Sequence, residues 1–143
     1  MRRRAAAAVL LAGALAGWAP APLPLTWTPR EARQLVDIIE ESDDEGLAPA
    51  DYDADGVERA ARSGDAALLD AVATAAALEL AGDYWAGRVP AGERVGWHIA
   101  GTSRSEPVLR ARIAGGLQAG RLEATFAALL PAHEDYRALR AAL

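Results

Sequence analysis

Residues 65–88 read DAALLDAVATAAALELAGDYWAGR, and this stretch predicts the helix around which the fold is organised. Apolar residues recur at spacings of three and four, which places them on one helical face: Leu69, Val72, Ala76, Leu80 and Tyr84. Three more apolar residues lie off that face: Leu68, Ala75 and Leu78. A helix that is apolar nearly all round is usually central. Asp65 can cap its first turn, and Gly87 can end it in a left-handed conformation.

The flanking sequence predicts shorter helices that pack on this one. Thr28, Pro29 and Glu31 form a helix start with a capping box, and Gly46 ends that helix, which runs to about residue 44. The other expected helical segments are a short turn at 49–51 and helices over 57–62, 105–119, 122–130 and 133–143. No stretch alternates with period two, so we expect no sheet and an all-α domain of about five to six helices.

The shorter helices also carry apolar residues that predict where they pack. The expected core-facing residues are Leu35, Ile38 and Ile39, then Val108, Leu109, Ile113 and Leu117, then Leu122, Phe126, Leu129 and Leu130. Leu47 and Tyr52 are the expected anchors of the irregular segment between the first two helices.

The N-terminal residues have the layout of a secretory signal peptide. Three arginines precede a short apolar run and a proline-rich segment, and the run is shorter than a bilayer-spanning helix requires. We expect a signal peptide over residues 1–21, a proline-rich linker over 22–27 and one helical domain over 28–143. The protein is then periplasmic. Pro20 and Pro22 disfavour cleavage, so an uncleaved membrane anchor is the alternative.

Composition excludes several classes of function. The chain has no cysteine, which excludes a disulfide, a thiolate nucleophile and a cysteine metal site. Its formal net charge is −5, and it falls to −8 when the three N-terminal arginines are removed. Nucleic-acid binding needs clustered positive charge, so we expect no nucleic-acid partner. We expect no cofactor either.

An acidic segment raises two alternatives. Asp51, Asp53, Asp55 and Gly56 spell the opening of a calcium loop, but Arg62 stands where the bidentate glutamate belongs, so we expect weak calcium binding or none. Residues 40–55 hold eight acids and no base, which fits either a solvated surface or a dock for a basic partner. We favour the solvated surface.

No catalytic group is assembled by the sequence. His98 and His133 have no encoded metal or nucleophile partner, and Ser103 and Ser105 lack an elbow motif. We therefore expect no enzymatic activity from this chain alone. Three aromatic residues are interpreted as core covering and not as a sugar-stacking platform: Tyr84, Trp85 and Trp97.

The order of these segments resembles a known family. A GLAPADY turn follows the first helix, LLDAVATAAALELAGDYWAGRV leads into GWHI, and the chain closes with LPAHEDYRALRAAL over residues 130–143. This pattern is similar to the N-terminal scaffold domain of YcbB-type L,D-transpeptidases, over residues 28–143. The closing motif is the most specific part of the resemblance.

The resemblance implies a periplasmic protein of peptidoglycan remodelling. Relatives carry a peptidoglycan-binding domain and a catalytic domain with a cysteine nucleophile after this segment, and they form 3→3 crosslinks. This chain has no cysteine, so no catalytic residue is carried over. We expect a non-catalytic scaffold domain that is truncated or free-standing. The alternatives are a small exported calcium- or protein-binding module, and a transpeptidase whose catalytic part is encoded elsewhere.

The last helix is the expected functional surface. Tyr136, Leu139 and Leu143 share one side of it and need a covering surface. We predict that they form a docking edge, left partly bare in the isolated chain, for a transpeptidase catalytic domain or a peptidoglycan-binding domain. The alternative is that this helix simply packs on the core.

Overall fold

The structure, a computed structural model of the chain, describes residues 24–88 and 105–142, apart from the side chains of Arg137 and Leu139. These residues form six α-helices, two 3₁₀-helices (η1 and η2) and no strand, which confirms the expected all-α domain. The elements are α1 (Pro29–Glu40), η1 (Glu41–Glu45), η2 (Pro49–Tyr52), α2 (Ala54–Ser63), α3 (Ala66–Ala86), α4 (Glu106–Gln118), α5 (Leu122–Ala127) and α6 (Glu134–Arg140).

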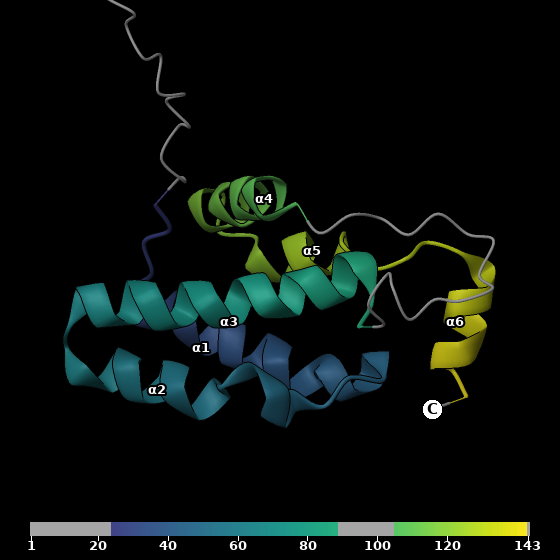
Figure 1. Ribbon diagram of the computed structural model, residues 1–143, viewed down its shortest axis with the longest axis horizontal. Coiled ribbons are helices and arrows are strands. Elements are labelled where there is room, and N and C mark those ends of the chain that lie inside the picture. Colours follow the sequence, from purple (N-terminus) through teal and green to yellow (C-terminus); the bar gives the residue numbers. More distant parts are fainter. Residues whose placement is uncertain (1–23, 89–104, 143) are drawn as a thin grey trace, which may run out of the picture.

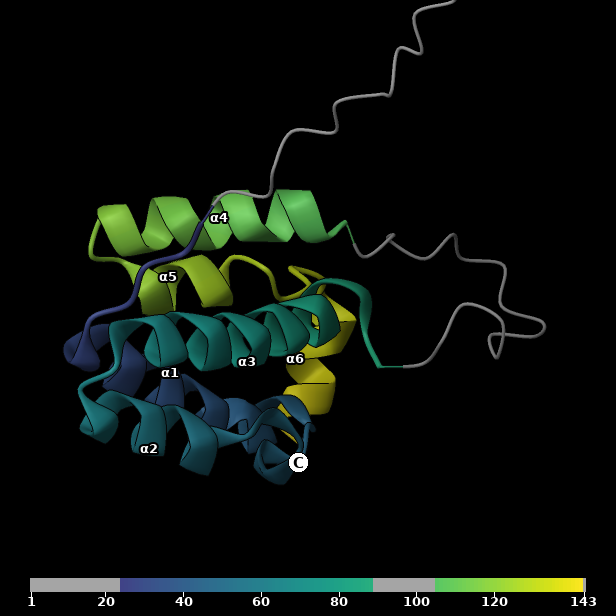
Figure 2. The ribbon, with the colours of Figure 1, turned by 60° about the vertical axis from the view of Figure 1, so that its left-hand side comes forward.

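The helices form layers on either side of the longest one, α3 (Figure 1). Helices α1 and α2 pack against α3 from one side and α4 packs from the other, while α5 lies between α4 and α1. Figure 2 shows α4 above α5, the layer of α1 and α3 below them, and α2 at the opposite surface. Helix α6 stands apart, at the end of the domain where α3 finishes.

The central helix is confirmed, with two differences at its surface and its end. Leu69, Ala76, Leu80 and Tyr84 are buried as expected. Leu68 is 45% exposed, because its side of the helix is covered by no neighbouring helix of the described part. Gly87 ends the helix with φ 73° and ψ 162°, so it has the expected positive φ but is extended and not left-handed helical.

The segment before α1 belongs to the packed domain. The capping box is present: the Thr28 N–H donates to Glu31 Oε2 at 2.8 Å, and the Glu31 N–H donates to Thr28 Oγ1 at 3.3 Å. Leu25 and Trp27, which the sequence interpretation put in a linker, are buried in the core. Trp27 is therefore part of the domain that residue 28 was expected to begin.

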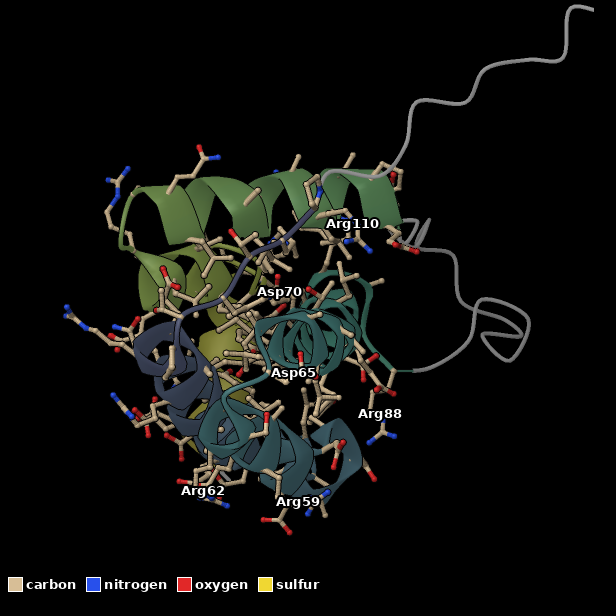
Figure 3. All side chains as sticks on the ribbon, turned by 90° about the vertical axis from the view of Figure 1, so that its left-hand side faces the viewer. Arg59, Arg62, Asp65, Asp70, Arg88 and Arg110 are labelled. Atoms are coloured by element: carbon tan, nitrogen blue, oxygen red, sulfur yellow. The ribbon has the colours of Figure 1, made fainter. Side chains whose placement is uncertain are left out.

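Trp27 is held on α3 by two hydrogen bonds. Its backbone N–H donates to Asp70 Oδ1 at 2.7 Å, and its indole Nε1–H donates to Thr74 Oγ1 at 3.1 Å. Asp70 and Thr74 are one turn apart on α3, so they present a ready pair of acceptors to the extended segment. Figure 3 shows Asp70 directed from α3 toward this segment.

Helices α4 and α5 pack closely because a glycine lies at their contact. A Cβ at Gly116 would overlap Thr125 Oγ1 and lie 2.9 Å from the Thr125 Cβ. Leu109 and Ile113 of α4 are buried as expected, with Leu122 and Phe126 of α5. The expectation for Val108 was wrong. This side chain is 46% exposed, because the buried face of α4 runs through Leu109, Ile113 and Gly116 instead.

Several expectations lie outside the described residues. They are the signal peptide, the first part of the proposed linker, and Trp97, His98 and Ser103. Within the described ranges, no helix is both long and apolar enough to span a bilayer.

Candidate functional site

Glu45, at the end of η1, is the point to which α6 is attached. The Tyr136 hydroxyl of α6 donates a hydrogen bond to Glu45 Oε2. Arg140 Nη2 lies 3.1 Å from Glu45 Oε1 and 3.7 Å from Asp44 Oδ2. The Glu45 side chain is only 6% exposed, so its charge is compensated by partners and not by water.

Local sequence explains why these groups meet. Tyr136 and Arg140 are four residues apart and therefore lie on the same face of α6. On the other side of the contact, η1 stops at Gly46, which is left-handed with φ 75° and ψ 21°. The N–H of Gly46 donates to Asp43 and that of Leu47 donates to Ser42, which closes the turn and fixes the direction of Glu45.

A cavity of about 220 Å³ lies beside this contact. It combines an apolar floor with an acidic rim. The lining residues are Ile38, Tyr84, Phe126, Ala127 and Leu130, with Glu41, Asp44, Glu45, Glu123 and Arg140. Arg140 is the one cation among these described residues, so α6 places a positive charge beside the acidic rim.

Burial and these carboxylates make both nearby tyrosines weak acids. Burial raises the pKa of Tyr136, and its hydrogen bond to Glu45 raises it further. Burial also raises the pKa of Tyr84, to about 12, with the charge of Glu45 adding to the effect. The Tyr84 ring packs edge-on against Phe126, with centroids 6.2 Å apart and planes at 82°. Both phenols stay neutral over the physiological range.

The predicted docking edge is placed only in part. Tyr136 is half-buried and bonded to Glu45. The side chain of Leu139 and the whole of Leu143 lie outside the described residues. The packing of α6 against the other helices is sparse, and the contacts described for it are the polar ones through Tyr136 and Arg140. The docking edge therefore stays a prediction.

Sequence analysis missed the polar anchor of this edge. Its signal is the pair Tyr136 and Arg140 at a spacing of four, together with an acidic segment that has no base of its own. In the structure, several carboxylates of that segment form ion pairs. Asp44 and Glu45 pair with Arg140, and Asp51 pairs with Arg88. Residues 40–55 are therefore not only a solvated surface.

The calcium-loop residues are also engaged elsewhere. Asp53 caps α2, where its carboxylate accepts the Gly56 N–H at 3.1 Å, and it lies 3.9 Å from Arg59. Asp51 forms an ion pair with Arg88. In residues 24–88 and 105–142, no three potential metal ligands converge.

A second polar cluster, also missed from the sequence, joins η2 to the end of α3. The Tyr52 hydroxyl donates to Asp83 Oδ2 at 2.9 Å, and both residues are buried. Arg88 Nε lies 3.7 Å from the same Asp83 oxygen while its Nη1 binds Asp51. Figure 3 labels Arg88 at the end of α3. The available signal was an aspartate inside an apolar helix, which needs a partner when buried.

The remaining candidates do not assemble a catalytic site in the described part of the chain. His133 is exposed, and Ser105 is the N-cap residue of α4, but its side chain forms no capping hydrogen bond. Tyr84 is core, as expected. Trp85 is half-buried and carries the Arg112 guanidinium over its ring, 4.6 Å from the centroid.

Comparison with protein families identifies the fold. The family described as "Scaffold domain" matches residues 24–143. The chain belongs to this family. The match begins before Trp27, in agreement with the packing of that residue on α3. No curated protein and no solved structure matches the chain.

The scaffold domain is the N-terminal domain of L,D-transpeptidases, and the resemblance found in the sequence is thereby confirmed. It is a non-catalytic part of those proteins. A non-catalytic role agrees with the described residues, whose polar side chains join helices to one another.

Proposed function

We propose that this scaffold domain supports an L,D-transpeptidase catalytic domain in cell-wall remodelling, and that α6 is the edge on which that domain docks. The chain itself performs no chemistry. The observation that carries the proposal is the family match over residues 24–143, because the same domain precedes the catalytic part in L,D-transpeptidases.

The way α6 is attached supports its role as the docking edge. A helix of seven residues is too short to be stable by itself in water. Here it is held by Tyr136 and Arg140, through polar groups that converge on Glu45. Polar anchors fix position and direction, whereas apolar area supplies most of the binding energy of an interface. A partner that buries Leu139 and Leu143 would supply that area.

The proposal is tested by binding in solution. The catalytic domain of a YcbB-type L,D-transpeptidase, prepared without its own scaffold domain, is titrated into the full chain by calorimetry. We expect saturable one-to-one binding. Leu139→Asp should weaken it by about tenfold or more, because a charge would enter the apolar part of the interface.

Val108→Asp is the matched control. Val108 is 46% exposed on α4 and is not part of α6, so the same apolar-to-acid change should leave both folding and binding unaltered. Absence of binding, or an equal loss for Val108→Asp and Leu139→Asp, would refute docking at α6. Circular dichroism of each variant shows whether the domain remains folded.

We further propose that the protein acts in the periplasm after export. The support is the basic and apolar N-terminal sequence together with the family context. N-terminal sequencing of protein from the periplasmic fraction is expected to find a start within residues 17–25. Cytoplasmic protein that still begins at Met1 would contradict export with cleavage.

A further inference from the structure

A second hollow lies between α4 and α5, which are neighbouring helices in Figure 2, and different residues of α5 line it than line the cavity beside Glu45. Its volume is about 430 Å³, within the range of about 300–1,000 Å³ that is common for ligand pockets. Two arginines, one threonine and five small residues line it: Arg112, Arg121, Thr125, Gly115, Gly116, Ala119, Ala124 and Ala128. We call this hollow the α4–α5 groove.

The two arginines stand near opposite ends of the groove. Arg112, Gly115, Gly116 and Ala119 follow one face of α4, and α5 turns back beneath α4 directly after Arg121. Seven residues of helix rise about 10 Å, so about this length separates Arg112 from the turn that carries Arg121. Between them, the described lining residues other than Thr125 are glycines and alanines.

Both guanidinium groups are available to a ligand. Arg112 and Arg121 are exposed, and no carboxylate of the described residues lies within ion-pair distance of either. Five other described arginines do pair with acids: Arg59, Arg62, Arg88, Arg110 and Arg140. Arg112 lies over the face of Trp85, which fixes its plane and leaves its N–H edge free to donate.

The backbone below Arg121 is fixed as well. Its N–H donates to the Gly116 carbonyl at 2.9 Å, and its own carbonyl accepts the Thr125 N–H at 3.0 Å and the Thr125 hydroxyl at 2.8 Å. Thr125 Oγ1 still has an acceptor position for a ligand N–H. The groove thus presents two guanidinium groups and one hydroxyl group around a surface of glycine and alanine residues.

We propose that the α4–α5 groove binds an extended acidic peptide segment, with two carboxylates three residues apart. A segment in the extended polyproline II conformation has three residues per turn and rises about 3.1 Å per residue, so carboxylates three residues apart lie on the same face, about 9 Å apart, which is close to the separation of the two arginines along the groove. Each guanidinium can bind a carboxylate through two parallel hydrogen bonds. The Gly and Ala floor lets the peptide backbone lie close to the helices.

A peptide fits this groove better than a longer polyanion does. The chain carries a formal charge of −5, which opposes nucleic acids and other dense polyanions over its surface. Among the described residues that line the groove none is aromatic, so they offer no stacking surface for a sugar. The proposal is independent of the docking function, because the described residues that line the groove all come from α4, α5 and the residues beside them.

The test uses the full chain and the peptide acetyl-Asp-Ala-Ala-Asp-amide, observed through amide chemical shifts. We expect shifts concentrated at Gly115, Gly116 and Thr125, and none with acetyl-Asn-Ala-Ala-Asn-amide. Arg112→Gln and Arg121→Gln should each weaken binding by about threefold to fivefold, as expected for one exposed ion pair. Gly115→Leu should abolish binding without a change of charge, because a Cβ there enters open space in the groove.

Arg59→Gln is the matched control. It removes the same charge from α2, which Figure 3 shows on the opposite side of the molecule from α4. Equal weakening by Arg59→Gln, equal binding of the uncharged peptide, or absence of shifts at millimolar peptide would each overturn the proposal. Tighter binding of a carboxylated oligosaccharide at the same amides would overturn the assignment to a peptide.

Discussion

Single polar residues set the arrangement of the least regular parts of this domain. Asp83 is a carboxylate that is only 8% exposed, inside the most apolar helix, and it accepts the hydroxyl of Tyr52 from a segment 31 residues earlier. Glu45 holds α6, and Asp70 holds the segment before α1. A carboxylate that is shielded from water must find donors, so each of these residues favours the packing that brings its donors to it.

The Tyr52→Phe variant tests this role. The change removes one donor from buried Asp83, so we expect it to destabilise the domain by about 1–3 kcal/mol. The measurement is urea unfolding. The Ser42→Ala variant is the comparison, because the Ser42 hydroxyl is fully buried with no hydrogen-bond partner among the described residues. It should be neutral or slightly stabilising, and a stability loss equal to that of Tyr52→Phe would contradict the account.

Among the elements, the helix α3 could be predicted from the sequence. The buried faces of the helices and segments that pack on it could be predicted only in part. Its length, its Asp65 cap and its buried face follow from local spacing. The faces of the shorter helices depend on which neighbour covers them, and for α4 the expectation for Val108 was wrong. The burial of Trp27 was not predicted, because the prolines before it indicated a linker. Asp70 and Thr74 of α3 accept its two hydrogen bonds.

Leu80→Ala tests the central position of α3. Leu80 is fully buried in the second half of α3, and other helices pack on both sides of α3, so the vacated space cannot collapse. We expect a loss of about 2–5 kcal/mol in the free energy of unfolding. Leu68→Ala on the exposed side of the same helix should cost much less. Similar unfolding midpoints for the two variants would show that the buried face is misassigned.

Two adjacent glycines of α4 provide a matched test of the α4–α5 contact. Gly115→Ala should stabilise the domain by up to about 1 kcal/mol, since nothing lies within 4 Å of the new Cβ and alanine favours helix. Gly116→Ala should destabilise it by about 1–3 kcal/mol, because the Cβ would collide with Thr125. Thermal unfolding of both variants measures the difference. Equal effects of the two substitutions would mean that α5 does not approach α4 at Gly116.

On the scale of the whole molecule, polar contacts join segments that are distant in the sequence, in addition to the apolar packing of the helices. Tyr136 and Glu45 are 91 residues apart, and Arg88 and Asp51 are 37 apart. Periodicity within one helix carries no information about such pairs, so helix positions were predictable and these contacts were not. For the acidic segment we favoured a solvated surface over a basic partner, yet Arg88 and Arg140 of the same chain pair with three of its carboxylates.

The three tyrosines should make the folded domain sensitive to alkaline pH. The pKa values of Tyr52, Tyr84 and Tyr136 are all raised, chiefly by burial, so above about pH 10 the unfolded chain releases protons that the folded domain keeps. The contribution of these tyrosines to the free energy of unfolding is fully present below about pH 10. Above that pH the free energy of unfolding falls, by up to about 1.4 kcal/mol per pH unit for each tyrosine. Tyrosinate absorbance and helical circular dichroism should therefore change together. Ionisation near pH 10 with full helicity retained would contradict this.

Hydrogen exchange of α6 tests the central claim most directly, namely that α6 is a docking edge for a catalytic domain. In the isolated monomer we predict weak protection of the amides of residues 137–142, because α6 is short and is held mainly through Tyr136 and Arg140. Addition of an L,D-transpeptidase catalytic domain should raise their protection by about tenfold or more, while α3 stays unchanged. Strong protection of residues 137–142 in the monomer, or none gained on addition of the catalytic domain, would contradict the account.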